Sequence, residues 1–387
     1  MSATNYKRDY SLTGPENQRA QDKGLASADW YKCPIPRQTM KELMKRKDWP
    51  GIRDTLLWLV MLAGAGYLAY LSWGTWWAIP AFFFYGTLYM TPGDSRWHET
   101  AHGTPFKTPW INELMNQVSA FMILRAPTPW RWSHSRHHTD TIIVGRDAEI
   151  FAPRPPVYRD ILREIFRLFG APIDVWKHIM HCFGKMHPTE KDFVPETEWR
   201  RCFLESRITV LIYVGIVVWC ISVDSILPAM FIGLPSFYGN FINVLEALSQ
   251  HVGLHEDVLD HRLNTRTIYM NPFMRFIYWN MNYHIEHHMF PMVPYHALPA
   301  LHKEMKHDCP EPYRNLFSAL CVVIPALWKM RKDPGYTTVR PLPPTANPFK
   351  YGPHPYGTVQ WPGDPRKGLQ AHAARGAFTN GANQRTL

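Results

Sequence analysis

Three groups of histidines are the residues in this 387-residue chain whose types and spacing could do chemistry. The segment NYHIEHHMFP, residues 282–291, has histidines at positions i, i+3 and i+4, and WSHSRHHTD, residues 132–140, repeats that spacing. The third group is a pair, His98 and His102, four positions apart. On a helix of about 3.6 residues per turn, such imidazoles leave from one face. The members of these groups are His98, His102, His134, His137, His138, His284, His287 and His288.

The number of imidazoles indicates which metal chemistry they could support. Neutral imidazole binds zinc, copper, iron and nickel, but a closed zinc site uses about four ligands. Eight or nine histidines suit two metal ions with open positions, and a pair of irons that activates dioxygen fits well. His251 and His255, again at i and i+4, could supply a ninth ligand. A dry pocket at a membrane face would shield the oxidant, so C–H bonds of a lipid chain are the natural target.

Charged and aromatic residues accompany the histidines. The candidates for orienting the imidazole rings are Glu99, Asp140, Asp147, Glu149, Asn282 and Glu286, although each could equally be a helix cap or a surface group. Arginines interleaved with tryptophans could bind a phosphate or carboxylate head group, or anchor the chain at a membrane surface. They are Arg125, Arg131, Arg136, Arg146 and Arg154, with Trp110, Trp130 and Trp132.

Long uncharged stretches predict the elements that position these groups. Residues 55–91, 208–223 and 226–245 contain no Lys, Arg, Asp or Glu, and one membrane crossing needs about 20 residues. We therefore predict an all-α integral membrane protein with four transmembrane helices in two hairpins and a helical cytoplasmic cap that carries the histidines. The spans are expected at about 55–73, 75–91, 208–223 and 226–248, with a break or turn at Pro92-Gly93.

The charge pattern predicts which compartment holds the histidines. Each hairpin returns the chain to the side it left, so all the groups face one compartment. Every one of the 42 Lys and Arg residues lies outside the hairpins, which favours a cytoplasmic location for both termini and the histidines. The net charge of +10 then indicates a membrane-facing basic surface, and nucleic-acid binding is not expected. The six cysteines include no C-x-x-C pair and should stay reduced.

Composition divides the chain into three parts. Residues 1–50 are polar and are expected to form a surface arm without a signal-peptide core. Residues 51–330 form the membrane domain with the histidines. Residues 331–387 are rich in Pro and Gly, which is typical of a disordered or surface-draped tail.

The histidine segments, above all NYHIEHHMFPMVP and WSHSRHH, resemble the three histidine boxes of the membrane-bound fatty acid desaturase superfamily, and the resemblance covers residues from about 50 to 310. It implies a fold of four transmembrane helices with a cytoplasmic cap, a nine-histidine di-iron site, and desaturation with dioxygen and two external electrons. At matching positions it gives the eight grouped histidines as iron ligands, with His251, preferred over His255, as the ninth. The chain has no His-Pro-Gly-Gly haem-binding element, so a separate ferredoxin, rubredoxin or cytochrome is the expected donor.

The predicted function is a fatty-acyl desaturase of the bacterial inner membrane, acting on a membrane lipid or acyl substrate. Because the histidine spacing is shared by desaturases and hydroxylases, a hydroxylase on the same scaffold is an alternative. A second alternative is a desaturase of a smaller non-lipid compound, as in the similar dihydrorhizobitoxine desaturases. A metal transporter would need histidines within its spans, and the uncharged stretches contain none. The oligomeric state is not predicted.

Overall fold

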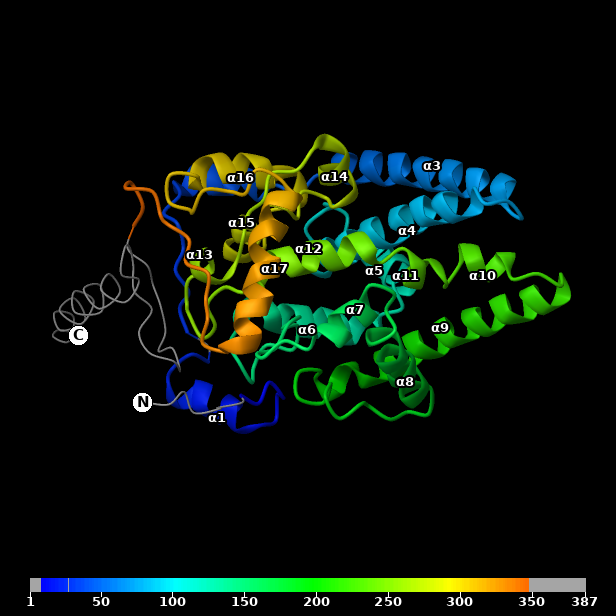
Figure 1. Ribbon diagram of the computed structural model, residues 1–387, viewed down its shortest axis with the longest axis horizontal. Coiled ribbons are helices and arrows are strands. Elements are labelled where there is room, and N and C mark those ends of the chain that lie inside the picture. Colours follow the sequence, from blue (N-terminus) through cyan, green and yellow to red (C-terminus); the bar gives the residue numbers. More distant parts are fainter. Residues whose placement is uncertain (1–7, 27, 348–387) are drawn as a thin grey trace.

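The computed structural model describes residues 8–26 and 28–347, and over these residues the chain is helical (Figure 1). The helices of eight or more residues are α1 (Pro15–Asp22), α3 (Asp48–Ser72), α4 (Ala78–Ala101), α5 (Pro109–Met122), α6 (Pro127–Thr139), α8 (Gly170–Cys182), α9 (Glu196–Ser222), α12 (Phe241–His251), α16 (Leu298–Met305) and α17 (Leu316–Lys332). The shorter ones are α2 (Arg37–Leu43), α7 (Tyr158–Glu164), α10 (Leu227–Phe231), α11 (Pro235–Tyr238), α13 (His261–Asn264), α14 (Pro272–Ile277), α15 (His284–Met289) and the 3₁₀ turn η1 (Tyr295–Ala297). Two isolated bridges are the strand-like pairings within this part of the chain.

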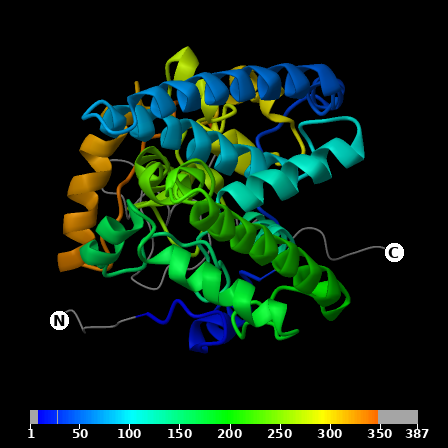
Figure 2. The ribbon, with the colours of Figure 1, turned by 90° about the vertical axis from the view of Figure 1, so that its right-hand side faces the viewer.

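The long helices extend toward one end of the molecule, and a group of shorter elements forms the other (Figure 1). The turn between α3 and α4 and the turn after α9 lie at the same end, which we call the hairpin end. The views in Figures 1 and 2 agree that α4 lies between α3 and the α9–α10 pair. The opposite end, which we call the cap, contains residues 8–47 with α6, α13, α15, α16 and α17.

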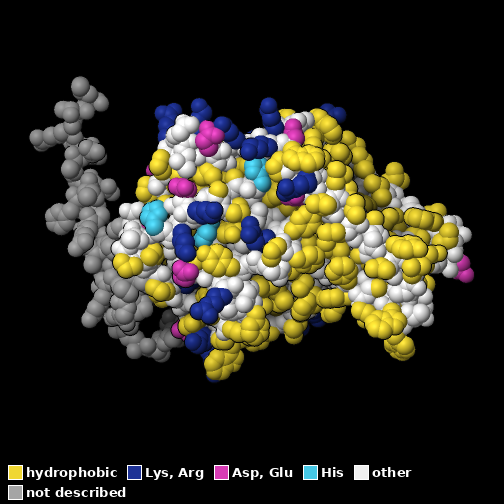
Figure 3. Space-filling view, turned by 90° about the horizontal axis from the view of Figure 1, so that it is seen from above, with side chains coloured by type: hydrophobic (Ala, Val, Ile, Leu, Met, Phe, Trp, Pro, Cys, Tyr) yellow, Lys and Arg dark blue, Asp and Glu magenta, His cyan; other side chains and the backbone are white. Residues whose placement is uncertain are grey.

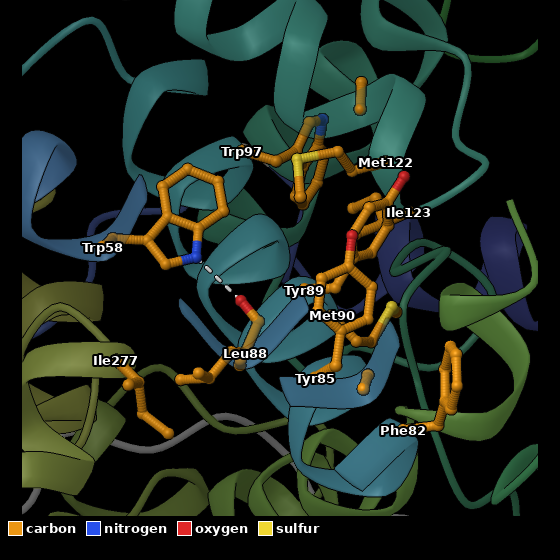
Figure 4. Packing of buried hydrophobic residues seen from close by; sticks show 13 residues of the cluster. Trp58, Phe82, Tyr85, Leu88, Tyr89, Met90, Trp97, Met122, Ile123 and Ile277 are labelled. Atoms are coloured by element: carbon orange, nitrogen blue, oxygen red, sulfur yellow. Dashed lines mark hydrogen bonds between the residues drawn. The ribbon is translucent and has the colours of Figure 1, made fainter. Parts of the chain in front are cut away.

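Helix α4 continues through Pro92, so the predicted break at Pro92-Gly93 is wrong. A proline has no N–H, and it therefore leaves the carbonyl four residues earlier without its helical hydrogen bond. That carbonyl belongs to Leu88, and it accepts a hydrogen bond of 2.7 Å from Nε1 of Trp58 in α3 (Figure 4). Both side chains are buried in one cluster between the two helices. The bond from α3 thus satisfies the group that proline orphans, and α4 reaches the histidines unbroken.

The segment predicted as the fourth span, residues 226–248, is divided between three helices, α10, α11 and α12. Gly233, between α10 and α11, has φ 98°, a backbone conformation that side chains disfavour. At Gly239 a Cβ atom would lie 2.1 Å from the carbonyl oxygen of Gly86. Gly86 and Gly239 thereby let the end of α11 touch the backbone of α4, and the chain bends around this contact.

Within the described residues, two helical segments are long and apolar enough to cross a membrane: residues Arg37–Ser72, which end with α3, and α9. Helix α4 has the length, but its second half carries buried polar residues, including Arg96 and Glu99. Exposed hydrophobic side chains cover the hairpin end, whereas Lys and Arg side chains gather toward the cap (Figure 3). The protein is therefore helical, with an apolar end that suits a lipid environment.

The described part of the predicted surface arm is built into the cap. Arg8 is 4% exposed and its Nη2 pairs with Glu16 at 2.5 Å and with Asp257 at 2.6 Å. Leu25 and Cys33 are also buried. The first part of the predicted arm is therefore packed into the cap, because its charges pair with buried acids there, whereas α2 buries none of its residues.

The predicted C-terminal tail lies mostly outside the described residues, which end at residue 347. Its described beginning is ordered on the cap. Thr338 N donates to Gly253 O at 2.7 Å, and Arg340, 8% exposed, donates to Glu311 O at 2.8 Å. Residues 333–347 therefore lie on the cap without regular structure.

Candidate metal centre

Four helices carry the grouped histidines to one place. His98 lies in the last turn of α4 and His102 caps its C-terminus. His134, His137 and His138 lie on α6, and His284, His287 and His288 make up half of α15. His251 is the last residue of α12.

The first group contains five imidazoles from α4, α6 and α15. One nitrogen from each of the five lies within 4.8 Å of the others. The Nε2 atoms of His98 and His287 are 2.9 Å apart, and those of His287 and His138 are 3.1 Å apart. His134 Nε2 lies 3.1 Å from the Nε2 atoms of both His102 and His138.

The second group joins α6, α12 and α15. His137, His251 and His288 each contribute a nitrogen within the same 4.8 Å limit. His284 lies beside them, with its Nε2 atom 3.1 Å from Nε2 of His251 and 3.1 Å from Nε2 of His288. His255, the other candidate for a ninth ligand, is buried but belongs to neither group.

Hydrogen bonds on the far side of the rings orient several of these nitrogens. Nδ1 of His137 donates to Asp147 Oδ2 at 2.8 Å, and Nδ1 of His134 donates to Glu149 Oε2 at 3.1 Å. Nδ1 of His251 donates to the carbonyl of Asn264 at 2.9 Å. A proton held at Nδ1 leaves the lone pair on Nε2, the atom that points into the group.

The donor set fits metal ions. Metal–imidazole bonds are about 2.1 Å long, so neighbouring ligand nitrogens of an octahedron lie about 3.0 Å apart. The Nε2 separations of 2.9–3.1 Å match that edge. Burial, and then neighbouring imidazoles, lower the pKa of His138 and His288 well below the usual value, which keeps both rings neutral. A cation between these nitrogens would use the lone pairs that face one another.

The six predicted orienting residues divide into two sets. Asp147 and Glu149 make the bonds described above, and Glu99 Oε1 lies 3.1 Å from Nδ1 of His287. The other three contact different groups. Asp140 pairs with Arg146 at 3.0 Å, Asn282 donates to Ile268 O, and Glu286 pairs with His302 at 2.5 Å.

One buried histidine near the centre escaped sequence reasoning. The ring of His261 lies 5.3 Å from that of His288, and Trp30 stacks on its other side at 4.3 Å, with an angle of 5° between the planes. His261 belongs to no helical-spaced group, and the stack joins residues far apart in the chain. Only tertiary structure brings these rings together.

A cavity of about 180 Å³ opens onto the centre. The histidines on its wall are His98, His134, His137, His251 and His284. Of the arginines predicted to hold a head group, Arg125 and Arg154 line this cavity. The other three form ion pairs elsewhere: Arg131 with Glu113, Arg136 with Asp192, and Arg146 with Asp140.

The chain is similar to known proteins over the residues that carry the histidine groups. A family model described as fatty acid desaturase matches residues 74–319. The sn-1 oleoyl-lipid 12-desaturase of Anabaena variabilis is 22% identical over 275 residues, which cover 70% of this chain and 66% of that protein. The chloroplastic omega-6 fatty acid desaturase of Brassica napus is 24% identical over 308 residues, 73% of this chain and 64% of that protein.

A third relative is the sn-1 acyl-lipid omega-3 desaturase (ferredoxin) of Nostoc sp., 24% identical over 176 residues, 43% of this chain and 47% of that protein. The chain thus spans somewhat less than two thirds of the length of the curated relatives it matches. The family match extends from the first hairpin turn to the start of α17 and includes every grouped histidine. The chain belongs to the fatty acid desaturase family, a family of oxidoreductases.

Proposed function

We propose that this protein is a membrane-bound, dioxygen-dependent desaturase that holds two irons and introduces a carbon–carbon double bond into a fatty-acyl substrate. The observation that carries the proposal is the convergence of nine imidazoles from α4, α6, α12 and α15 in two adjoining groups. The first group would hold one iron through His98, His102, His134, His138 and His287. The second iron would be held by His137, His251, His284 and His288.

The iron pair, when bound, supplies the activation of dioxygen. The reaction takes a CH₂–CH₂ unit, dioxygen, two electrons and two protons to a CH=CH unit and two water molecules. The electrons would come from a separate ferredoxin, rubredoxin or cytochrome, and the name of the Nostoc relative supports a ferredoxin.

The chain's own residues prepare the site. Asp147 and Glu149 fix the orientation of His137 and His134 before any ligand arrives. His134, His284, His287 and His288 are at most 2% exposed, whereas His98, His102, His138 and His251 are partly exposed, so one side of the site is closed to bulk water. A dry surround protects a strong oxidant from quenching before it meets the C–H bond.

We further propose that α3, α4, α9 and the α10–α12 segment make the four membrane crossings predicted from the sequence. The exposed apolar side chains of α3 and α9 support this topology. The histidines and both termini would then lie on the cytoplasmic side of a bacterial inner membrane, as the distribution of Lys and Arg predicts.

A second candidate substrate is a smaller, non-lipid compound desaturated by the same chemistry. The cavity at the histidines favours it, since about 180 Å³ is below the roughly 300–1,000 Å³ of ordinary ligand sites and charged side chains lie among the apolar ones on its wall.

The test is product identification in bacteria that express the protein, with His288→Ala as the control. Mass spectrometry of the lipid and the water-soluble fractions should find a product two mass units lighter than its precursor, absent from the control. Growth under ¹⁸O₂ separates the reactions, because hydroxylation leaves label in the product and desaturation releases it as water. Purified protein with zinc, without iron and without any new product would refute the proposal.

A further inference from the structure

An ion pair lies on the cavity wall one helical turn from a histidine of the centre. Asp94 precedes His98 by four residues on α4, so both leave from the same face of the helix. Nη1 of Arg125 donates to Oδ1 of Asp94 at 2.6 Å. Both residues line the cavity, and their side chains are 16% and 20% exposed.

Arg125 is held in a fixed orientation. Its guanidinium lies 4.9 Å from the ring of Trp97 and 4.2 Å from the ring of Trp130. The ring of Trp97 is in turn 5.6 Å from that of His134. Leu124, just before the arginine, has φ 56°, a conformation uncommon for a side chain of this kind and often found at functional sites.

Part of the arginine's hydrogen-bonding capacity is unused. Its Nε atom is buried and has no hydrogen-bond partner within the described chain. A planar guanidinium has five N–H donors, and it binds a carboxylate or a phosphate with two of them at once. Nε itself is enclosed by protein, so an anion in the cavity would reach the part of the Arg125 side chain that is exposed, 20% of it, beside a carboxylate that can accept from a cation.

The rest of the wall carries charges of both signs. Its acids are Asp94, Glu149, Glu164 and Glu256, and its bases are Arg125, Arg154 and Arg167. Arg154 pairs with Glu256 at 3.1 Å, and Arg167 pairs with Asp174 at 2.5 Å. Because the signs nearly balance, the wall favours neither a simple anion nor a simple cation.

We propose that the substrate presents a zwitterionic group to the Asp94–Arg125 pair, with its anion on the guanidinium and its cation on the carboxylate. This inference rests on the proposed function, since it places C–H bonds of the molecule that carries this group at the histidine centre. Two sources share the chemistry, a free small zwitterion and the head group of a zwitterionic lipid.

The binding test uses the iron-loaded full-length protein and three probes with one six-carbon scaffold: norleucine, hexanoate and hexylamine. Norleucine, the zwitterion, should raise the melting temperature by about 2–4 °C at a concentration some ten times its dissociation constant. The other two carry one charge each and should shift it less. Equal shifts by all three probes would overturn the proposal.

A paired substitution tests the residues. Asp94→Asn with Arg125→Gln removes both charges together, so that neither is left buried alone, and it should abolish the norleucine shift while iron content stays at the wild-type level. The matched control is Asp160→Asn with Arg159→Gln, an ion pair on α7 whose side chains are 25% and 69% exposed and do not line the cavity, which should retain the shift. Retention of the shift in the Asp94/Arg125 variant contradicts the assignment, and Arg125→Lys gives a second measurement if that variant does not fold.

Product analysis identifies the source. A new product in the water-soluble fraction that carries both charges assigns a free zwitterion, and one in a phosphatidylethanolamine fraction assigns a lipid head group. A product confined to an anionic lipid, such as phosphatidylglycerol, refutes the inference and leaves the desaturase intact. Conversely, a norleucine shift in protein that binds no iron and makes no product supports the binding site and refutes the proposed function.

Discussion

The two ends of the molecule differ in which kinds of side chain they expose and which they bury. At the hairpin end, large apolar side chains are exposed, and Val60, Leu211 and Ile221 are 70–74% accessible. In the cap, charged side chains are buried. Arg262 pairs there with Asp260 at 2.7 Å and with Asp308 at 2.8 Å, and all three side chains are 0% exposed.

This difference fits the proposed function, which needs an oxidant's site beside a membrane. Lipid can cover apolar helices without a protein partner, whereas buried charges need the fixed partners that the cap provides. Helix α4 connects the two ends, apolar near Ala78 and lined with buried polar groups from Thr91 onward. The histidines lie at the polar end of this helix, where neighbouring residues can orient them.

The largest expected effect comes from removing a histidine at the heart of the cap. We expect His287→Ala, and likewise His137→Ala, to abolish product formation and to lower bound iron, because each removes a nitrogen from one of the two groups. Metal analysis with product quantification is the measurement. His307→Ala is the control, since His307 is exposed; full iron and full activity in both ligand variants would falsify the site.

Substitution of His251 and of His255 tests which of the two is the ninth ligand. His251→Ala should halve the iron content, from two ions to about one, and abolish activity, because His251 belongs to the second group only. His255→Ala should keep both irons, since His255 lies outside both groups. Iron per folded protein decides between them, and loss of iron in the His255 variant alone would reverse the assignment.

A charged substitution at the hairpin end tests whether α9 faces lipid. Val217 on α9 is 56% exposed, and Val217→Lys should disfavour membrane insertion by about 3 kcal/mol. The membrane-bound fraction of the expressed protein should fall. Gln38→Lys on α2 adds the same charge at an exposed cap position and should leave that fraction unchanged; equal behaviour of the two variants would contradict a lipid-facing α9.

Residues that orient the rings should have smaller effects. Asp147 accepts bonds from His137 Nδ1 and from the N–H of Ile142, both at 2.8 Å. Asp147→Asn should weaken iron binding about 10- to 100-fold, a usual cost of losing such a partner. Asp140→Asn is the matched control, because Asp140 pairs with Arg146. An equal loss in both variants would indicate a general effect of charge, without a role for the bond to His137.

Long uncharged stretches predicted the helical fold, and spacings of three or four residues predicted the histidine groups, because both signals are local in the sequence. His134, His137 and His138 needed only the helix α6 to point the same way. The errors concern contacts between distant segments. The sequence does not reveal that Arg8 pairs with Glu256 and Asp257, about 250 residues away, and it gives no sign that Gly86 and Gly239 would let α4 touch α11.

The continuity of α4 is the error with the clearest physical cause, and it gives the smallest expected effect. Trp58→Phe keeps an aromatic ring at this position but removes the N–H that donates to Leu88 O. A buried carbonyl then loses its partner, which should lower the free energy of unfolding by about 1–3 kcal/mol. The melting temperature should fall, while Trp76→Phe, at an 88% exposed site, should not change it. Adding Pro92→Ala supplies a backbone N–H to the same carbonyl and should recover part of the loss. If the double variant is no more stable than Trp58→Phe, the tryptophan stabilises α4 through packing, and its hydrogen bond is not what carries the helix past Pro92.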